Sequence, residues 1–392
     1  MNDAWLLSIT NKNEKLDINM SYCFVCLFRA DKSASGLAFR VPLLWKQLAT
    51  EGEDVRLIIN QSLYDKTLYN LERRLLNKVY IIPEPVDFRV TSLLCVPPIL
   101  LYLFLIEKIN KFHLSAGGAY FIDYLRLISK ALYKEIIIHT SIGSKSLDMI
   151  VEGDLSSRYY KLHVNLMEKS DKIDCLYSPT GFPEYSYKCV QSPGSFSWKY
   201  NTNTIKGMDI GSCKSNDILF VGSLLSSKNY QLAIEGYKQL SKDSEVMRSL
   251  DYPRLIIIAP NIHEELKAEI DEFNKSSSGE ILLESYNNID DILQKSYLFL
   301  SLQDYDNYPS QSLIEAMVFG CTVIATDFGE TRNIVKVENG NILIEKDVNE
   351  LMDAIKNVLD RPHDKNEKNI KMILKNHTIE NYAEYFKLNF LK

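Results

Sequence analysis

The sequence has no apolar run long enough to cross a bilayer. Its longest run, Ser92–Ile106, holds 15 residues and includes Pro97 and Pro98, whereas a membrane-spanning helix needs about 20 residues. We interpret this run as a buried packing helix. The alternative is a helix that touches a membrane, flanked by Lys108 and Lys111. The first ten residues contain no basic leader, so we predict no signal peptide.

Three further absences narrow the class of protein. No GxGxxG is present, so a dinucleotide-binding fingerprint is not supported. The seven cysteines include one CxxC, Cys23 and Cys26, whose side chains point to opposite faces of a strand, and no second pair completes a zinc site. The net charge is only −6, which argues against a protein devoted to nucleic acid. We therefore expect reduced thiols in a cytoplasmic protein.

Length and charge distribution both suggest two different halves. A chain of 392 residues with 46% hydrophobic and 24% charged residues is typical of a globular protein with more than one core. Residues 1–205 carry 24 Lys+Arg and 21 Asp+Glu, and the remainder carries 21 and 30. The front half is therefore slightly basic and tolerates an anionic surface better than the acidic back half.

Strands alternate with helices along the whole chain, which predicts a parallel α/β architecture. The expected strands of the front half are Tyr22–Phe28, Val55–Asn60, Val79–Ile82, Phe112–Ser115, Glu135–Thr140 and Asp174–Ser178. The alternation restarts after a polar stretch at 200–217. We predict two doubly wound Rossmann-like domains, residues 1–205 and 206–375, facing a central cleft. Residues 376–392 are expected to form a helix that crosses back to the first domain.

The segment 299–320 places polar residues where a parallel sheet offers a ligand site, beyond the carboxyl ends of buried strands. A helix is expected to begin near Ser310 or Ser312, both good N-caps, and to end at Gly320. Such a helix start suits a phosphate. Glu315 lies away from the apolar face and could accept hydrogen bonds from a sugar diol; alternatively, it only complements the helix dipole.

Two other loops occupy comparable positions. After the strand that ends at Gly222, the loop 223–229 carries Lys228, a mobile cation suited to a diphosphate, and Gly222 permits close backbone approach. In the front half, Gly36 belongs to a small-residue loop behind the first strand. His139 is predicted at the carboxyl end of its strand, pointing toward the cleft; the alternative is a surface histidine without a function.

These residues together resemble the retaining GT-B glycosyltransferases, in particular the large family 4. The resemblance lies in "SLIEAMVFGCTVIATDFGETRNIV", "NGNILIEKD", "FVGSLLSSKN" and "IIIHTSIGS". It implies a metal-independent enzyme, without a cofactor, that transfers a sugar from a nucleotide-sugar donor with retention. It assigns His139, Lys228 and Glu315 to catalysis. The donor site that it implies consists of Gly36, Gly222, Ser223, Lys228, Asp306, Asn307, Tyr308, Pro309, Ser310, Gln311, Ser312 and Glu315.

Two positions depart from the family pattern. The family usually carries a second glutamate eight residues before the one matched by Glu315, and that position is Asn307, next to Asp306. The arginine that the family has five residues before its lysine is replaced by Ser223. Both departures fall where the donor is bound.

Three alternatives remain at this point. Asp304 and Asp306 could form the metal motif of a GT-A fold, although that motif belongs to a single domain at the front of a chain. The GT-B fold could also support a nucleotide-sugar epimerase or a non-catalytic nucleotide-sugar-binding protein.

Within the main hypothesis, the acceptor is a glycan or a lipid-linked saccharide in bacterial surface polysaccharide biosynthesis. A lipid-linked acceptor would bring the protein to the inner face of the plasma membrane.

Overall fold

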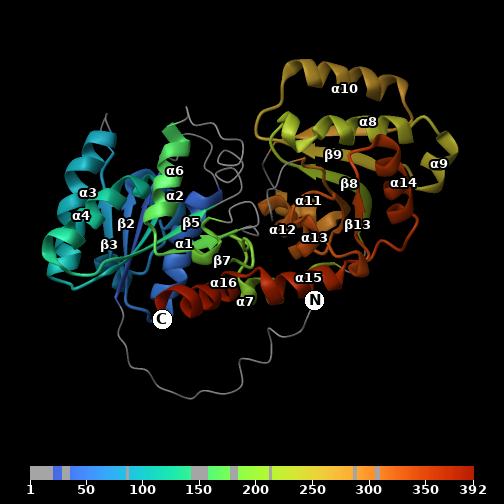
Figure 1. Ribbon diagram of the computed structural model, residues 1–392. Coiled ribbons are helices and arrows are strands. Elements are labelled where there is room, and N and C mark those ends of the chain that lie inside the picture. Colours follow the sequence, from blue (N-terminus) through green and yellow to red (C-terminus); the bar gives the residue numbers. More distant parts are fainter. Residues whose placement is uncertain are drawn as a thin grey trace.

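The computed structural model describes residues 21–28, 36–84, 88–142, 158–176, 184–211, 214–285, 289–304 and 310–392. These residues form two lobes, each built on a parallel sheet, and Figure 1 shows the lobes side by side. The first sheet has the order β3-β2-β1-β4-β5-β6-β7, and the second has the order β10-β9-β8-β11-β12-β13. The predicted pair of doubly wound domains is therefore confirmed.

The first lobe surrounds β1, a central strand buried along its whole length. Its strands are β1 (Tyr22–Leu27), β2 (Val55–Asn60), β3 (Val79–Ile82), β4 (Lys111–Ala116), β5 (Ile137–Ile142), β6 (Lys172–Cys175) and β7 (Cys189–Gln191). Its helices are α1 (Gly36–Thr50), α2 (Gln61–Thr67), α3 (Phe88–Leu105), α4 (Ile122–Leu132) and α6 (Arg158–Lys169). Helices α1 and α2 cover one face, and α3 and α4 cover the other.

The two cysteines of the CxxC confirm this alternation. Cys23 belongs to the core under α3 and α4, whereas Cys26 belongs to the core under α1. Burial raises the pKa of Cys26 to about 12, so this thiol stays protonated at neutral pH. The CxxC is therefore part of two separate hydrophobic cores.

The second lobe repeats the plan with β8 and β11 at its centre. Its strands are β8 (Ser215–Val221), β9 (Arg254–Ile258), β10 (Glu280–Glu284), β11 (Ser296–Ser301), β12 (Thr322–Thr326) and β13 (Ile342–Ile344). Its helices are α7 (Thr202–Gly207), α8 (Tyr230–Leu240), α9 (Ser244–Ser249), α10 (Glu264–Ser276), α11 (Ile289–Lys295), α12 (Gln311–Val318), α13 (Thr331–Ile334) and α14 (Val348–Leu359). Helices α8, α10 and α14 cover one face, and α11 and α12 cover the other.

The C-terminal end of the chain joins the lobes. Helix α15 (Glu367–Asn376) packs on α12, and α16 (Ile379–Phe386) continues beneath the first lobe, followed by the π-helical turn Lys387–Leu391 (Figure 1). Three aromatic residues of this end, Tyr382, Phe386 and Phe390, lie in the same core as α1 and β1. The apolar face of α16 therefore completes the first lobe.

Candidate functional site

A candidate site lies at the carboxyl ends of β8 and β11, where an open parallel sheet binds ligands. The short loop after β8 carries Lys228, and the loop after β11 carries Gln303. Lys228 Nζ donates to Gln303 Oε1 at 3.0 Å, and Asn229 Nδ2 donates to Leu302 O at 2.7 Å. The two loops are thus joined, although they are far apart in the sequence.

Helix α12 begins at the same place. Ser310 is its N-cap, and its side chain accepts from Leu313 N at 3.3 Å, as the sequence predicts. Gly320 follows the helix with φ +71°, which confirms the expected left-handed termination. The start of α12 therefore presents the backbone N–H groups of a helix N-terminus and the positive end of the helix dipole.

Lys228 and the start of α12 face one cavity of ≈ 10 Å³, about enough for one water molecule. Among its lining residues are Lys228, Gln303, Ser310 and Ser312. Burial lowers the pKa of Lys228 to about 8, because the ammonium has lost part of its hydration. A bound anion would restore that lost stabilisation, so the arrangement is chemically suited to phosphate oxygens.

Glu315 lies one helical turn beyond Ser312, about 4.5 Å further along the axis by helix geometry. The sequence predicts that it faces away from the core, but the residue is only 8% exposed. Burial raises the pKa of Glu315 to about 7; the Lys199 ammonium opposes this rise, and Asp290 adds to it. Lys199 Nζ lies 3.9 Å from Glu315 Oε2. The carboxylate is therefore covered by residues that precede the second lobe.

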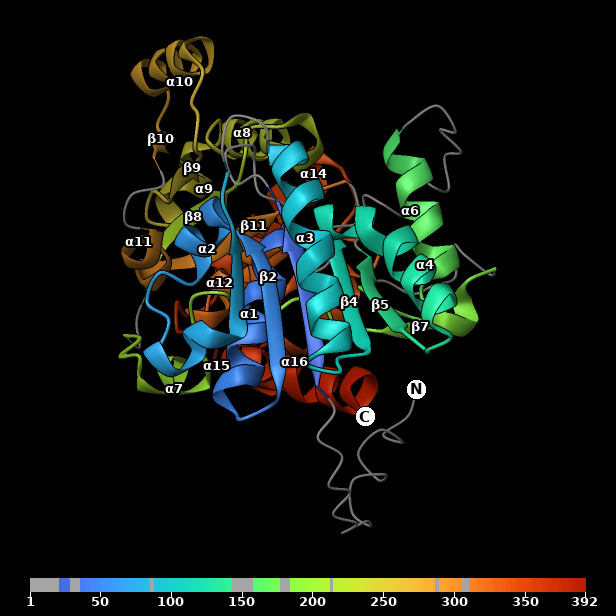
Figure 2. The same cartoon turned by 90° about the vertical axis from the view of Figure 1, so that its left-hand side faces the viewer.

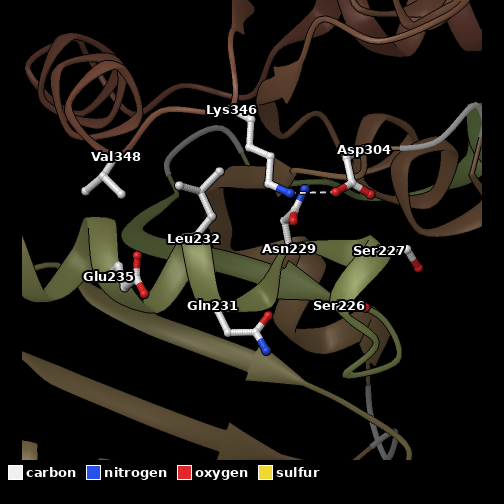
Figure 3. Close-up of a pocket in the computed structure, with 9 residues that line it drawn as sticks. All are labelled: Ser226, Ser227, Asn229, Gln231, Leu232, Glu235, Asp304, Lys346 and Val348. Carbon is white, nitrogen blue, oxygen red and sulfur yellow. Dashed lines mark hydrogen bonds and ion pairs between the residues drawn. The ribbon is translucent and has the colours of Figure 1, made fainter.

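A second polar hollow of ≈ 530 Å³ lies beside this site, on the side of α8 and α14 (Figure 3). Asp304, three residues after β11, forms an ion pair of 2.6 Å with Lys346 at the rim of this hollow. Because Asp304 follows a strand of the second of two sheets, the GT-A alternative, which needs a single domain at the front of the chain, does not fit the fold.

His139 occupies a different place from the predicted one. Strand β5 runs on to Ile142, so His139 is its third residue and not its carboxyl end. Its Nδ1 lies 2.8 Å from the Tyr22 hydroxyl, and its ring packs edge-on against Phe390 at 5.2 Å. Burial lowers the pKa of His139 to about 3. The placement predicted from the sequence is wrong, because the C-terminal turn covers this part of the sheet.

Of the remaining predicted site residues, the structure describes some and leaves four undescribed. Gly36 opens α1, Gly222 follows β8, and Ser223 is half-buried behind it. Gln311 Nε2 donates to Ser195 Oγ and Phe196 O, both at 2.9 Å. The other four, Asp306, Asn307, Tyr308 and Pro309, lie outside the described residues. No local sequence signal marks Gln303, Lys199 or Asp290, because each reaches the site only through tertiary contacts.

The comparison with protein families decides what kind of domain holds this site. Residues 211–376, which include Lys228, α12 and Glu315, match the model of the family Glycosyl transferases group 1. The match spans the second lobe from β8 to β13. No curated protein sequence matches the chain.

Solved structures resemble this chain over both lobes, whereas the family model matches the second lobe alone. HepE from Anabaena, in complex with UDP and glucose, matches at a TM-score of 0.64 and 12% identity, covering 94% of this chain and 98% of that chain. Sucrose-phosphate synthase from Thermosynechococcus elongatus matches at 0.64 and 13%, with coverages of 94% and 98%. The lipopolysaccharide outer core galactosyltransferase WaaB matches at 0.61 and 13%, with coverages of 94% and 98%. At these identities the likeness establishes the fold, which is GT-B.

Proposed function

We propose that this protein is a glycosyltransferase that moves a sugar from a nucleotide-sugar donor to a glycan or lipid-linked acceptor, with retention of the anomeric configuration. One observation carries the proposal: Lys228, Gln303 and the start of α12 face one cavity at the carboxyl ends of β8 and β11, and Glu315 follows one turn later on the same helix. The group 1 domain that contains these residues supports the same conclusion.

The charged groups of the site determine how it would support sugar transfer. Departure of a nucleoside diphosphate requires stabilisation of its developing negative charge. The Lys228 ammonium and the N–H groups at the start of α12 supply it without a metal, and we propose a metal-independent reaction for that reason. Glu315, as a carboxylate, accepts hydrogen bonds from the ribose hydroxyls. His139 has no role in this mechanism, since its ring is enclosed by Tyr22 and Phe390.

Retention requires the acceptor to attack the face of the sugar from which the diphosphate leaves. The sequence offers no evident protein nucleophile, so we propose a same-face attack in which the leaving diphosphate stays next to the acceptor hydroxyl. Closure of the lobes would exclude water and so limit hydrolysis of the donor. Gly36, at the start of α1, is the proposed contact with donor and acceptor.

The donor is the first property to test. HepE was solved with UDP and glucose, so UDP-sugars head the panel, followed by GDP-, ADP- and dTDP-sugars. Binding to the folded state raises the unfolding temperature. We expect one donor to give the largest shift and expect Glu315→Ala and Lys228→Ala each to abolish it. Lys206→Ala, on the exposed side of α7, is the control and should keep it.

The same panel separates the alternative functions. A donor that is converted to an isomeric nucleotide sugar without any acceptor product would identify an epimerase. A donor that binds without turnover with every acceptor would identify a binding protein. If both the Glu315→Ala and Lys228→Ala variants retain the full shift, the site itself is assigned wrongly.

We further propose that the acceptor is lipid-linked, in bacterial surface polysaccharide biosynthesis, and that the protein docks on the membrane through α3. Every fourth residue along this helix and just beyond its end is apolar and exposed: Val90, Leu94, Pro98, Tyr102 and Ile106. Figure 2 shows α3 and α4 on the outer side of the first lobe. No helix of the described residues is long and apolar enough to cross a membrane, so the contact would be peripheral.

Lysines beside this stripe suit an anionic surface. Lys134 Nζ lies 5.9 Å from the centre of the Phe104 ring, which places the end of α4 next to the end of α3, and Lys108 and Lys130 are exposed. Lys111, by contrast, is buried and donates to the carbonyls of Leu391 and Lys392. Its expected role in flanking a membrane contact is therefore wrong.

Vesicle co-sedimentation tests the docking surface. With vesicles rich in phosphatidylglycerol, Leu94→Asp combined with Ile106→Asp should remove binding, because both side chains are about two-thirds exposed, at 69% and 66%. Tyr69→Asp is the control, since Tyr69 is 71% exposed but follows α2 on the opposite face of the sheet. Unchanged sedimentation of the double variant would contradict the proposal.

A further inference from the structure

The chain segment 195–200, which connects the two lobes, lies along α12. Gln311, the first residue of α12, donates to Ser195 Oγ and Phe196 O. At the other end of the segment, the Tyr200 ring packs edge-on against Phe319 at 5.4 Å. The segment is therefore held against α12 at both ends of the helix.

Between these contacts, Lys199 reaches two carboxylates of the second lobe. Its Nζ lies 3.2 Å from Asp290 Oδ1, at the start of α11, and 3.9 Å from Glu315 Oε2. The buried Tyr200 phenol faces the same two acids, since burial, then Asp290, then Glu315 raise its pKa. Lys199 is thus the cation of a cluster with two carboxyl groups and a phenol.

The charge of Glu315 depends on this arrangement. Burial and Asp290 both favour the protonated carboxyl, and the Lys199 ammonium favours the carboxylate. An ionised carboxylate accepts hydrogen bonds on both oxygens, whereas a protonated one is also a donor and accepts less well. A vicinal diol, which donates two hydroxyl groups side by side, is therefore recognised best when Glu315 is ionised.

We propose that Lys199 is a positioning residue of the donor site, which holds Glu315 as a carboxylate for the hydroxyl groups of the donor nucleoside. This inference rests on the proposed function, because it needs a nucleotide at Glu315. It extends the site beyond the group 1 domain, since Lys199 precedes residue 211, where that match begins. Donor affinity then depends on a residue of the connection between the lobes.

The pH profile of nucleotide affinity tests this role, with UDP and the best donor of the panel as probes. An opposite charge at this distance shifts a carboxyl pKa by about 1–3 units, and we take the lower limit because the Lys199 side chain is 46% exposed. In Lys199→Met, the affinity at pH 7 should fall about five-fold and recover by pH 9. Lys199→Arg should restore the wild-type profile, and Lys206→Met should leave it unchanged.

A second pair of variants shows whether Lys199 acts through Glu315. In the Glu315→Gln background, which has no charge to stabilise, Lys199→Met should cause no further loss of affinity. A loss of the same size in both backgrounds, or a loss that is independent of pH, would overturn the proposal, because it would indicate a direct contact or a structural role.

A measurement without ligand separates this proposal from the proposed function. The difference in unfolding temperature between wild type and Glu315→Gln reports ionisation of Glu315, and Lys199→Met should shift its pH midpoint upward. If no nucleotide sugar binds to the wild type, the proposed function fails, and the donor role of Lys199 fails with it. If nucleotide binds but the midpoint does not move, only the inference about Lys199 fails.

Discussion

The two lobes each hold a buried group of polar side chains, and the difference lies in what satisfies them. In the first lobe, the Asp174 carboxylate accepts from Arg40, Ser141, Tyr382 and Tyr385, at distances between 2.5 and 3.1 Å. In the second lobe, Lys228 and the start of α12 face a cavity. The first group is enclosed by α16 and is structural. The second borders a cavity at the edge of the sheet, where an anionic ligand would pair with the Lys228 ammonium.

The largest expected loss of stability comes from a substitution in the enclosed Asp174 group of the first lobe. Asp174→Ala leaves the Arg40 guanidinium, which is only 2% exposed, without its carboxylate, and should cost about 3–5 kcal/mol of unfolding free energy. Denaturant titration would measure this loss. Asp123→Ala is the control, because its exposed pair with Lys169 should contribute less than about 1 kcal/mol. Equal losses in the two variants would contradict the structural role of Asp174.

Glu315→Gln should change the free energy of unfolding by an amount that grows as the pH rises. Because the pKa of Glu315 is raised to about 7 in the folded protein, the folded state binds the proton more tightly than the unfolded chain. Wild type therefore loses stability, relative to Glu315→Gln, as pH rises from about 4.5 through 7. The loss above pH 7 should approach about 3 kcal/mol. A difference that does not vary with pH would contradict the burial of this carboxyl.

The buried His139 should make stability change with pH in the opposite direction, so that stability falls as the pH decreases. Its pKa is lowered to about 3 by burial, and nearby His113 lies in the same core with a pKa also near 3. The unfolded chain binds these protons below about pH 6.5, so stability falls as pH decreases, by about 2 kcal/mol per imidazole at pH 5. His139→Phe should make unfolding less sensitive to acid, measured by denaturant titration at pH 5 and 7. Unaltered sensitivity would show that His139 is protonated in the core.

The smallest effect on stability is expected at Gly222. A Cβ at this position would meet only the Phe220 ring, at 3.8 Å, which is an ordinary contact. Gly222→Ala should therefore fold and melt like the wild type but bind the donor more weakly, because the added methyl group occupies the space through which a phosphate would approach. Isothermal titration with the best donor of the panel measures the loss. Wild-type affinity would show that the phosphates do not approach this backbone.

Local patterns predicted the fold and both ends of α12, whereas the predicted carboxyl end of β5 is two residues short. The apolar runs located the central strands, and Ser310 and Gly320 mark the two ends of α12 as expected. Local patterns failed to predict the surroundings of a side chain where those surroundings come from residues distant in the sequence. His139 resembles a residue at a site, but the C-terminal turn covers it. Glu315 resembles an exposed residue, but Lys199 and Tyr200 lie over it. No local signal in a sequence reports which segment will cover another.

The most direct test of the account is a crystal structure of the protein with the nucleotide sugar that gives the largest thermal shift. We predict that the diphosphate lies between Lys228 Nζ and the backbone N–H groups at the start of α12, with the ribose hydroxyls donating to the Glu315 carboxylate. A nucleotide bound elsewhere, such as in the hollow beside Lys346, or one that contacts neither Lys228 nor Glu315, would contradict the central claim.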